Sequence, residues 1–312
     1  MDIRRIIVTG RLAEELEPLL TNERNREFRF VSERTLSQDL LNWADAFVGF
    51  QLYDGFDYRH LQWIHALGAG VDRFVGYLDP DGDAVLTRTV GPFGERITEY
   101  CLSYMLQDLQ HHRVFLRAQR EHKWSVLAPM PLKEQTVVIF GTGEIGRRVA
   151  ETLATFGVKV CGVSLHGDAR RGFSRVLSIR SIPSDTSPLS AADWVINTLP
   201  LTPATKELFD DRIFSVFNNV GLIQVGRGET VKTSALKRAM ENKNVRFAVL
   251  DVFENEPLPA DSDLWGEEDI RITPHIAALT TAAEAAESLL GTLRSMESGL
   301  PLTNRVNLKL GY

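Results

Sequence analysis

The stretch QTVVIFGTGEIGRRVAETLATFG, residues 135–157, decides the fold that we expect for this chain. It begins with an apolar, β-branched run typical of a buried strand, turns through the segment GTGEIG, and continues as a helix. A G-x-G-x-x-G segment in this setting brings the backbone and the helix N-terminus close to a pyrophosphate. The stretch therefore predicts the first strand, loop and helix of a dinucleotide-binding sheet.

Each glycine of this loop has a separate task in the predicted site. Gly141 permits the tight turn, Gly143 allows the backbone to approach the pyrophosphate, and Gly146 allows close packing of the helix. The alternative, a glycine-rich turn that binds nothing, is disfavoured by the strand and helix on either side. We expect the cofactor to contact every residue of the loop: Gly141, Thr142, Gly143, Glu144, Ile145 and Gly146.

The choice of nicotinamide cofactor depends on the end of the next strand, about 20 residues further on, where an acidic side chain would bind the ribose 2'-hydroxyl of NAD(H). In VKVCGVSLHGDARRGF, residues 158–173, Ser164 takes that place, and Arg170 and Arg171 follow in the loop. A neutral strand end beside two guanidinium groups suits a 2'-phosphate. The sequence therefore favours NADP(H) over NAD(H), with a solvated loop as the alternative for the arginines.

Short apolar runs recur along the chain and predict further strands. Before the glycine loop we expect strands at residues 4–10, 28–32, 46–50, 63–68 and 84–89. From the loop onward we expect them at residues 135–140, 158–163, 193–200, 220–226, 247–253 and 270–275. One long helix is expected over residues 95–123, and a helix capped by Thr281 and Glu284 follows the last strand.

These elements predict an α/β fold with two doubly wound parallel-sheet domains and a cleft between them. A Rossmann dinucleotide-binding domain would span residues 104–279. A flavodoxin-like substrate-binding domain would combine residues 1–103 with residues 280–312, because the last helix has no further strand to cover in the second domain.

Composition excludes several classes of function. The 312 residues are 24% charged and 44% hydrophobic, and the net charge of -6 gives no support to nucleic-acid or anionic-membrane partners. The N-terminal apolar run is too short for a secretory signal, and no stretch approaches the ~20 apolar residues of a membrane span. We therefore expect a cytoplasmic protein. The histidines show no metal-binding spacing, so we expect no metal.

Three chemically active side chains lie just beyond strand-like runs. Arg227 follows VGLIQVG, Glu256 follows RFAVLDVFEN, and His275 follows IRITP. A guanidinium could anchor a carboxylate-bearing substrate, and an imidazole beside a carboxylate could move one proton at a carbonyl. Alone, each residue could be an ion-pair partner, a turn residue or a structural histidine. Together, downstream of a dinucleotide loop, they indicate a catalytic set.

The chain resembles the D-isomer-specific 2-hydroxyacid dehydrogenase family, and the resemblance covers nearly its whole length. Within that family it looks most like the glyoxylate/hydroxypyruvate reductase A branch. The matching motifs occur in the family's order: LGAGVD at 67–72, GTGEIG at 141–146, LPLTPATKELF at 199–209, VGRGE at 225–229, LDVFENEPLP at 250–259 and TPHIAA at 273–278.

The resemblance implies a role for each site residue. Arg227 would hold a 2-oxo acid by its carboxylate and keto oxygen, and His275 would donate a proton to that oxygen as hydride reaches C2. Glu256 would orient the imidazole and favour its charged form. The substrate carboxylate would also bind backbone N–H groups of Ala69 and Gly70. On the cofactor side the resemblance places Leu199, Pro200, Val225, Gly226 and Asp251, the last with a structural role as the alternative.

The implied function is NADPH-dependent reduction of a small 2-oxo acid, such as glyoxylate, hydroxypyruvate or pyruvate, to the (R)-2-hydroxy acid by a homodimer. One alternative is a D-3-phosphoglycerate dehydrogenase-like enzyme, whose substrate needs additional positive charge. Another is an NAD(P)H-binding regulatory protein of the same fold that has no useful turnover. The segment AFVGFQLYDG, residues 46–55, lacks the tryptophan that the resemblance would place at about Gly49, so the substrate stays open.

Overall fold

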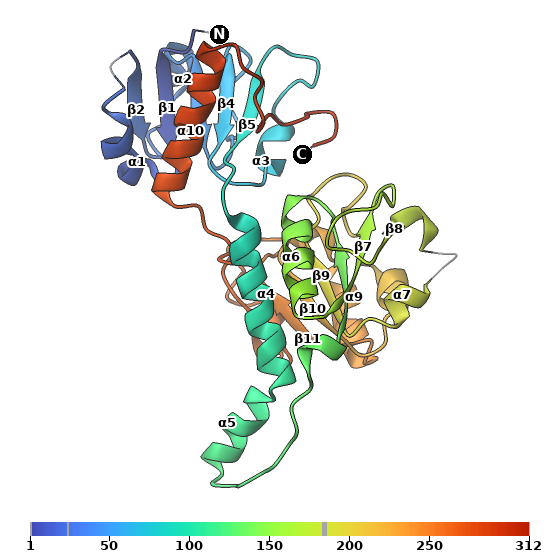
Figure 1. The fold of residues 1–312 in the computed structure, drawn as a ribbon. Coiled ribbons are helices and arrows are strands. Elements are labelled where there is room, and N and C mark those ends of the chain that lie inside the picture. The colour runs from blue at the N-terminus through green and yellow to red at the C-terminus, as the bar shows by residue number, and fades with distance from the viewer. Residues whose placement is uncertain (1, 24, 183–185, 312) are drawn as a thin grey trace. The chain divides into compact units, whose positions relative to one another are not determined.

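The computed structural model describes residues 2–23, 25–182 and 186–311 of the chain, which divides into two compact units. We call them unit 1, comprising Met1–Phe93 with Leu279–Tyr312, and unit 2, comprising Gly94–Ala278. Each unit is built on a parallel β-sheet with helices packed against it (Figure 1). The predicted fold class, two parallel-sheet α/β domains, is confirmed.

The sheet of unit 1 has the strand order 2-1-3-4-5, with every pair of neighbours parallel. This is the flavodoxin-like order, whose topological switch point lies between the first and third strands. All residues of β3 and β4 are buried, as expected for strands covered on both faces. Its strands are β1 (Arg5–Thr9), β2 (Glu27–Val31), β3 (Ala46–Gly49), β4 (Trp63–Ala66) and β5 (Val85–Arg88).

The last helix of the chain belongs to unit 1. Thr281 caps it, because the Thr281 hydroxyl accepts the N–H of Glu284 at 3.3 Å and the Glu284 carboxylate accepts the N–H of Thr281 at 3.1 Å. Its buried face, with Ala285 and Leu289, packs into the same core as Ile6 of the first strand. The helices of this unit are α1 (Ala13–Leu20), α2 (Gln38–Trp43), α3 (Asp72–Val75) and α10 (Ala282–Glu297).

The sheet of unit 2 is also parallel throughout, in the order β12-β11-β10-β9-β6-β7-β8. It is a Rossmann-type order extended by one strand, and its switch point lies between β6 and β9. The strands are β6 (Thr136–Phe140), β7 (Lys159–Ser164), β8 (Arg175–Ser178), β9 (Trp194–Asn197), β10 (Val220–Gln224), β11 (Val245–Leu250) and β12 (Ile270–Ile272).

The expectation of one long helix over residues 95–123 is wrong. The helix ends at Leu109, and a second helix begins at His112, because His111 adopts the left-handed conformation with φ 55°. This second helix, α5, and the segment after it project from the rest of unit 2 (Figure 1). The helices here are α4 (Phe93–Leu109), α5 (His112–Arg120), α6 (Glu144–Thr155), α7 (Ser187–Ser190), α8 (Asp211–Phe214) and α9 (Thr233–Glu241).

Candidate active site

The glycine loop lies between β6 and α6, at the carboxyl end of β6 and beside the switch point of the sheet of unit 2. Gly141 has a φ of 99°, which favours glycine. A Cβ atom on Gly146 would lie 1.9 Å from the carbonyl oxygen of Gly141, so helix and loop pack too closely for a side chain. A Cβ on Gly143 would meet no atom within 4 Å. Two glycines therefore serve packing, and the third borders open space.

The residues of this loop fit a dinucleotide. Gly143 is the N-cap of α6 and no side chain caps the helix, so the N–H groups of its first turn remain for a ligand phosphate. Thr142 and Ile145 are half-buried. Glu144 would oppose a phosphate, but it forms an ion pair with Arg147 at 3.2 Å, which offsets its charge.

The next strand, β7, ends on a neutral side chain. The Ser164 hydroxyl accepts the N–H of Gly167 at 3.0 Å, so it closes the turn that follows. Arg170 and Arg171 lie exposed in this turn, and Arg171 Nε is 3.4 Å from a carboxylate oxygen of Glu151 on α6. The guanidinium groups of Arg170 and Arg171 therefore follow the end of β7, which is the strand end that contacts the ribose of a bound dinucleotide in this fold.

The loops after β9 and β10 touch each other. A Cβ on Gly226 would lie 2.6 Å from the carbonyl oxygen of Leu199. The side chains of Leu199 and Val225 are buried in the hydrophobic cores on either side of the sheet, whereas Pro200 is exposed. Leu199 and Val225 therefore have their side chains in the core, and only their backbone atoms are left for a ligand.

Arg227 follows β10 and is half-buried, with its backbone held by a buried polar network. Its carbonyl oxygen accepts hydrogen bonds from Gln224 Nε2 at 2.8 Å and from the Thr230 hydroxyl at 2.6 Å. Asn197 Nδ2 in turn donates to the Thr230 hydroxyl at 2.7 Å. Sequence reasoning missed these three supporting residues, although Asn197 and Gln224 are polar side chains that end otherwise apolar strands.

His275 and Glu256, predicted as a pair, are in direct contact. The distance from His275 Nδ1 to Glu256 Oε2 is 2.8 Å, and Glu256 Oε1 accepts the N–H of Phe253 at 3.0 Å. An ionised carboxylate only accepts hydrogen bonds, so Nδ1 carries a proton and Nε2 is left to exchange one with a substrate. The His275 side chain is 50% exposed, which leaves it accessible to a ligand.

Asp251 positions the backbone around His275. Its carbonyl oxygen accepts the N–H of His275 at 2.9 Å, and its carboxylate accepts the N–H groups of Ile276 and Ala277 at 2.8 and 2.9 Å. His275 has a φ of 54°, so this histidine sits in the left-handed region. Because the carboxylate of Asp251 is directed at this loop, its predicted contact with the cofactor stays a prediction.

Two further hydroxyl groups extend this network into α4. The Thr273 hydroxyl donates to Asp251 Oδ1 at 2.6 Å, and the Tyr100 hydroxyl lies 2.6 Å from the Thr273 hydroxyl. Burial raises the pKa of Tyr100 far above its usual value, so its hydroxyl stays neutral. Neither residue was anticipated, because the contact joins segments 173 positions apart.

The loops that carry Arg227 and Glu256 are packed together. A Cβ on Gly228 would lie 1.9 Å from the carbonyl carbon of Phe253, so the loop after β10 contacts the loop after β11. All of these loops follow the carboxyl ends of parallel strands, the edge where ligands bind in open α/β sheets. The arginine, the acid-paired imidazole and the glycine loop therefore share one edge of unit 2.

Ala69 and Gly70 belong to unit 1, in the loop after β4. Arg88 Nη1 donates to the carbonyl oxygen of Ala69 at 3.1 Å. The C=O and N–H of a trans peptide point in opposite directions, so this bond turns the N–H of Gly70 away from Arg88. Across the described ranges of the chain, the N–H groups of Ala69 and Gly70 donate to no other protein atom.

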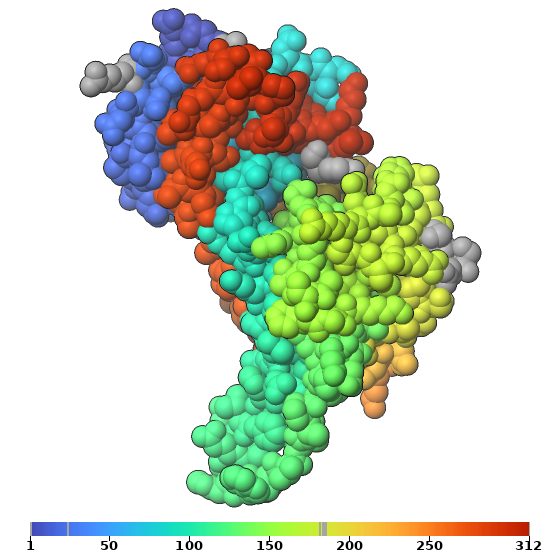
Figure 2. All heavy atoms as spheres, in the orientation of Figure 1, coloured from blue at the N-terminus to red at the C-terminus, as the bar shows by residue number. Residues whose placement is uncertain are grey.

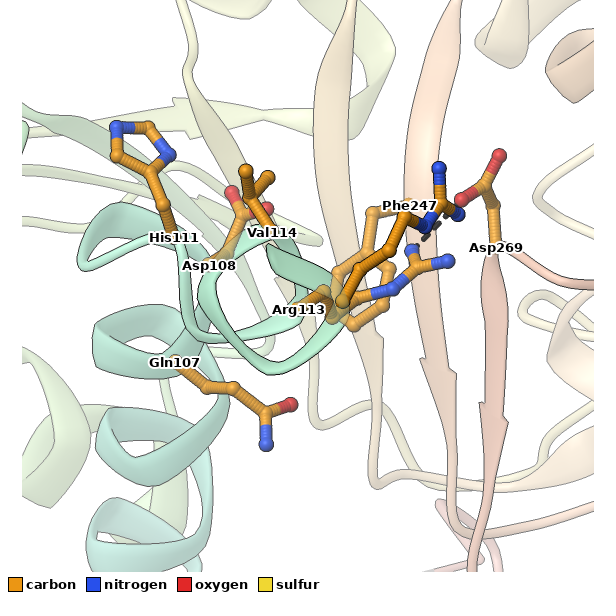
Figure 3. Close-up of a pocket in the computed structure, with 8 residues that line it drawn as sticks. Gln107, Asp108, His111, Arg113, Val114, Phe247 and Asp269 are labelled. Atoms are coloured by element: carbon orange, nitrogen blue, oxygen red, sulfur yellow. Dashed lines mark hydrogen bonds and ion pairs between the residues drawn. The ribbon is translucent and has the colours of Figure 1, made fainter. Parts of the chain in front are cut away.

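A pocket of about 310 Å³ opens elsewhere in unit 2, between the end of α4, the first part of α5 and the sheet (Figure 3). Arg113 and Asp269 form an ion pair of 2.7 Å in its wall, and Phe247 forms part of its floor. Phe247 lies near the start of β11, and Asp269 directly precedes β12. The pocket is therefore at the amino ends of these strands, away from the edge that carries His275.

The described residues contain no group of three or more histidine, cysteine, aspartate or glutamate side chains placed to hold a metal ion. No helix among them is long and apolar enough to cross a membrane.

A Rossmann sheet with a glycine loop, an arginine and an acid-paired histidine at one edge is typical of nucleotide-dependent dehydrogenases. Residues 102–277 match the family model described as D-isomer specific 2-hydroxyacid dehydrogenase, NAD binding domain. The chain belongs to the D-isomer specific 2-hydroxyacid dehydrogenase family of oxidoreductases.

Individual relatives agree with this assignment. Glyoxylate/hydroxypyruvate reductase A of Escherichia fergusonii is 30% identical over 81% of this chain and 83% of its own length. A family member from Xanthobacter autotrophicus Py2, solved with NADPH and MES, has a TM-score of 0.85 at 26% identity over the full length of both chains. The NADPH-dependent glyoxylate/hydroxypyruvate reductase of Sinorhizobium meliloti, solved with NADP and sulfate, has a TM-score of 0.83 at 26% identity over 99% of this chain and all of its own.

Proposed function

We propose that the protein uses NADPH to reduce a small 2-oxo acid, such as glyoxylate or hydroxypyruvate, to the 2-hydroxy acid, with the (R) configuration where C2 is a stereocentre. The observation that carries this proposal is the 2.8 Å contact between His275 Nδ1 and Glu256, at the same edge of the sheet as the glycine loop. The names of the relatives from Escherichia fergusonii and Sinorhizobium meliloti support the substrate class.

In this proposal the residues of unit 2 bind and protonate the substrate. The Arg227 guanidinium holds the carboxylate and polarises the keto oxygen. His275 gives its Nε2 proton to that oxygen, and Glu256 keeps the ring in the required orientation. When bound at the glycine loop, NADPH supplies the hydride that reduces the carbonyl carbon. Asp251 fixes the backbone that presents His275.

We assign dinucleotide binding to unit 2, and we assign to unit 1 further substrate contacts in addition to those of Arg227 and His275. In unit 1, the N–H groups of Ala69 and Gly70 would bind the substrate carboxylate, since a carboxylate accepts such donors strongly. Arg88 orients the peptide that joins them through its hydrogen bond to the Ala69 carbonyl oxygen. Its positive charge also favours an anion at this loop.

NADPH is proposed over NADH because Ser164 ends β7 where NAD-dependent sites need an acid, and Arg170 and Arg171 follow it. Solved relatives were crystallised with NADPH or NADP, which supports the same choice.

The test is a steady-state assay of several 2-oxo acids with NADPH and NADH side by side. We expect NADPH to be the better cofactor with every active substrate. Equal or better use of NADH would contradict the cofactor assignment, and tight NADPH binding without turnover would favour a regulatory protein.

We also propose that the protein is a homodimer. An arm, which we define as α5 and the segment through residue 130, projects from unit 2 (Figure 2). It exposes large apolar side chains, including Leu116 at 53%, Trp124 at 97% and Val126 at 90%. Exposed apolar surface of this kind marks an interface with a partner. A cytoplasmic location stays a prediction.

A further inference from the structure

The sheet of unit 1 has its own topological switch point, between β1 and β3. Phe50 follows β3 at this point, and its ring is in contact with two glycine loops. A Cβ on Gly10, after β1, would lie 3.1 Å from the ring, and a Cβ on Gly68, after β4, would lie 3.9 Å from it. Phe50 therefore lies directly beside the loop of Gly68 and Ala69 that we assign to the substrate carboxylate.

A guanidinium group lies over the same ring. The Cζ atom of Arg11 is 4.7 Å from the centroid of Phe50, and the side chain is exposed. Other arginines of this unit pair with acids, for example Arg5 with Asp45 at 2.8 Å. Within the described part of the chain, Arg11 has no carboxylate oxygen within 4.0 Å. The ring of Phe50 therefore positions the Arg11 guanidinium group but does not neutralise its charge.

Further polar groups lie along the loop after β3. Arg73 Nη1 donates to Gln51 Oε1 at 2.7 Å, so a second guanidinium group is held at this loop. The hydroxyl groups of Thr9 and Tyr53 are buried and have no hydrogen-bond partner among the residues that the structure describes. Thr9 is the last residue of β1, at the switch point itself. Burial and the nearby Glu33 carboxylate raise the pKa of Tyr53, so its hydroxyl stays neutral and can donate to a ligand.

We propose that this edge of unit 1 binds the far end of the substrate and selects 2-oxo acids that carry a second anionic group, a carboxylate or a phosphate. The edge consists of Thr9, Arg11, Phe50, Gln51, Tyr53 and Arg73. The inference rests on the proposed function and narrows its substrate class. Phe50 provides an apolar wall for the carbon chain, and Arg11 provides a charge that a neutral tail leaves without a partner.

The test compares kcat/KM for substrates that differ in their tails. Glyoxylate and hydroxypyruvate have neutral ends, oxaloacetate and 2-oxoglutarate have a second carboxylate, and phosphohydroxypyruvate has a phosphate. We expect at least one anionic-tailed substrate to exceed both neutral ones by about 10-fold or more, and high salt to reduce the difference. The preferred member shows whether the anion is a carboxylate or a phosphate.

Arg11→Gln is the diagnostic variant, and Arg4→Gln is its matched control. Arg11→Gln should lower kcat/KM for the preferred anionic-tailed substrate by about 10-fold and leave the neutral-tailed substrates nearly unchanged. Arg4 lies at the opposite, amino end of β1, so Arg4→Gln removes the same charge far from the proposed subsite. A preference of the wild type for neutral tails, or an equal loss on all substrates in Arg11→Gln, would overturn the proposal.

A binding measurement keeps this inference separate from the proposed reaction. In the presence of NADP⁺, (R)-malate should raise the Tm more than (R)-lactate, and Arg11→Gln should abolish the excess. Equal shifts for the two acids in the wild type would overturn the subsite. Turnover of neutral-tailed acids alone would leave the proposed function standing without the subsite, whereas no turnover of any 2-oxo acid would remove the proposed function itself.

Discussion

The carboxylate of Asp251 shows how much of this site depends on one buried residue. It is 1% exposed and accepts hydrogen bonds from Thr273, Ile276 and Ala277. Both oxygens of this side chain therefore act as hydrogen-bond acceptors. The left-handed backbone of His275 is therefore held by hydrogen bonds on both sides of that residue.

Asp251→Asn tests this role. The substitution keeps the size but places an amide donor against backbone N–H groups, which should cost about 1–3 kcal/mol of unfolding free energy. We expect kcat to fall by about 10-fold or more, because His275 loses its position, while the affinity for NADPH is retained. Steady-state kinetics and NADPH fluorescence titration measure these effects, with the exposed Asp83→Asn as control. Weaker NADPH binding at unchanged kcat would instead indicate a contact with the cofactor.

The residues predicted from sequence and those missed differ in how their positions arise. Arg227, Glu256 and His275 follow strand-like runs, and the order of strands in a parallel sheet brings such positions to one edge. Asn197 and Thr230 support Arg227 through a hydrogen bond between segments 33 positions apart. The polar end of β9 marks Asn197 in the sequence, but its partner Thr230 is set by tertiary packing and could not be predicted from a local pattern.

At the level of elements, two glycines of the β6–α6 turn have different roles. Gly146 packs against the Gly141 carbonyl oxygen, whereas Gly143 faces open space where a ligand can bind. Gly146→Ala should lower the Tm and abolish NADPH binding, since its methyl group overlaps the backbone. Gly143→Ala should leave the Tm nearly unchanged and weaken NADPH binding by roughly 10-fold or more, because its methyl group enters the space for the pyrophosphate. Thermal unfolding and NADPH titration distinguish the two. Normal NADPH affinity in Gly143→Ala would contradict this placement of the cofactor.

The buried histidine of β4 predicts a pH dependence of stability. His65 lies between the hydroxyls of Thr87 and Thr89, at 2.7 and 3.3 Å, and burial lowers its pKa from 6.5 to about 3. Below pH 6.5 His65 binds a proton in the unfolded chain, whereas in the folded chain it binds one only below about pH 3. The free energy of unfolding that His65 contributes therefore decreases as the pH is lowered from 6.5 to about 3, by roughly 1.4 kcal/mol per pH unit.

His65→Asn removes this titration and retains a polar group near Thr87. Urea unfolding between pH 7.5 and pH 4 should show a lower stability at the upper end and a flatter decline toward the lower end. The comparison with the wild type isolates the histidine, because the carboxylates titrate in both proteins. Parallel declines in the two proteins would contradict the assignment.

Elements with uniform burial were predicted well, and those with mixed environments were not. β3 and β10 are buried along their whole length and read as continuous apolar runs. β8 was missed because it is an edge strand in which one of four residues is fully buried. The break between α4 and α5 was missed because the left-handed residue is His111, which carries no turn signal such as glycine.

At the level of the whole molecule, the arm of unit 2 predicts the oligomeric state. Trp124 is 97% exposed in the single chain, so we expect a second copy to cover it in solution. Light scattering should give a mass twice the 35.0 kDa of one chain for the wild type, and Trp124→Glu should shift it toward that of a monomer. Phe156→Glu, which alters an exposed aromatic residue of unit 2 outside the arm, is the control. A monomeric wild type would refute the homodimer.

The two-unit architecture was predictable because both sheets are parallel and their connections follow the alternation of strand and helix. The contacts proposed to select the substrate could not be predicted from the sequence. The stacking of Arg11 on Phe50 joins two loops that become neighbours only when β1 pairs with β3.

In the proposed reaction His275, oriented by Glu256, protonates a 2-oxo acid while NADPH reduces it. The most direct measurement is the steady-state rate of NADPH oxidation by the wild type and by His275→Ala on a panel of 2-oxo acids. We predict turnover above about 1 per second by the wild type on at least one acid. In His275→Ala we predict a kcat/KM lower by about 10²-fold or more, with NADPH affinity unchanged. A variant that reduces the same acid at the wild-type rate would contradict the account.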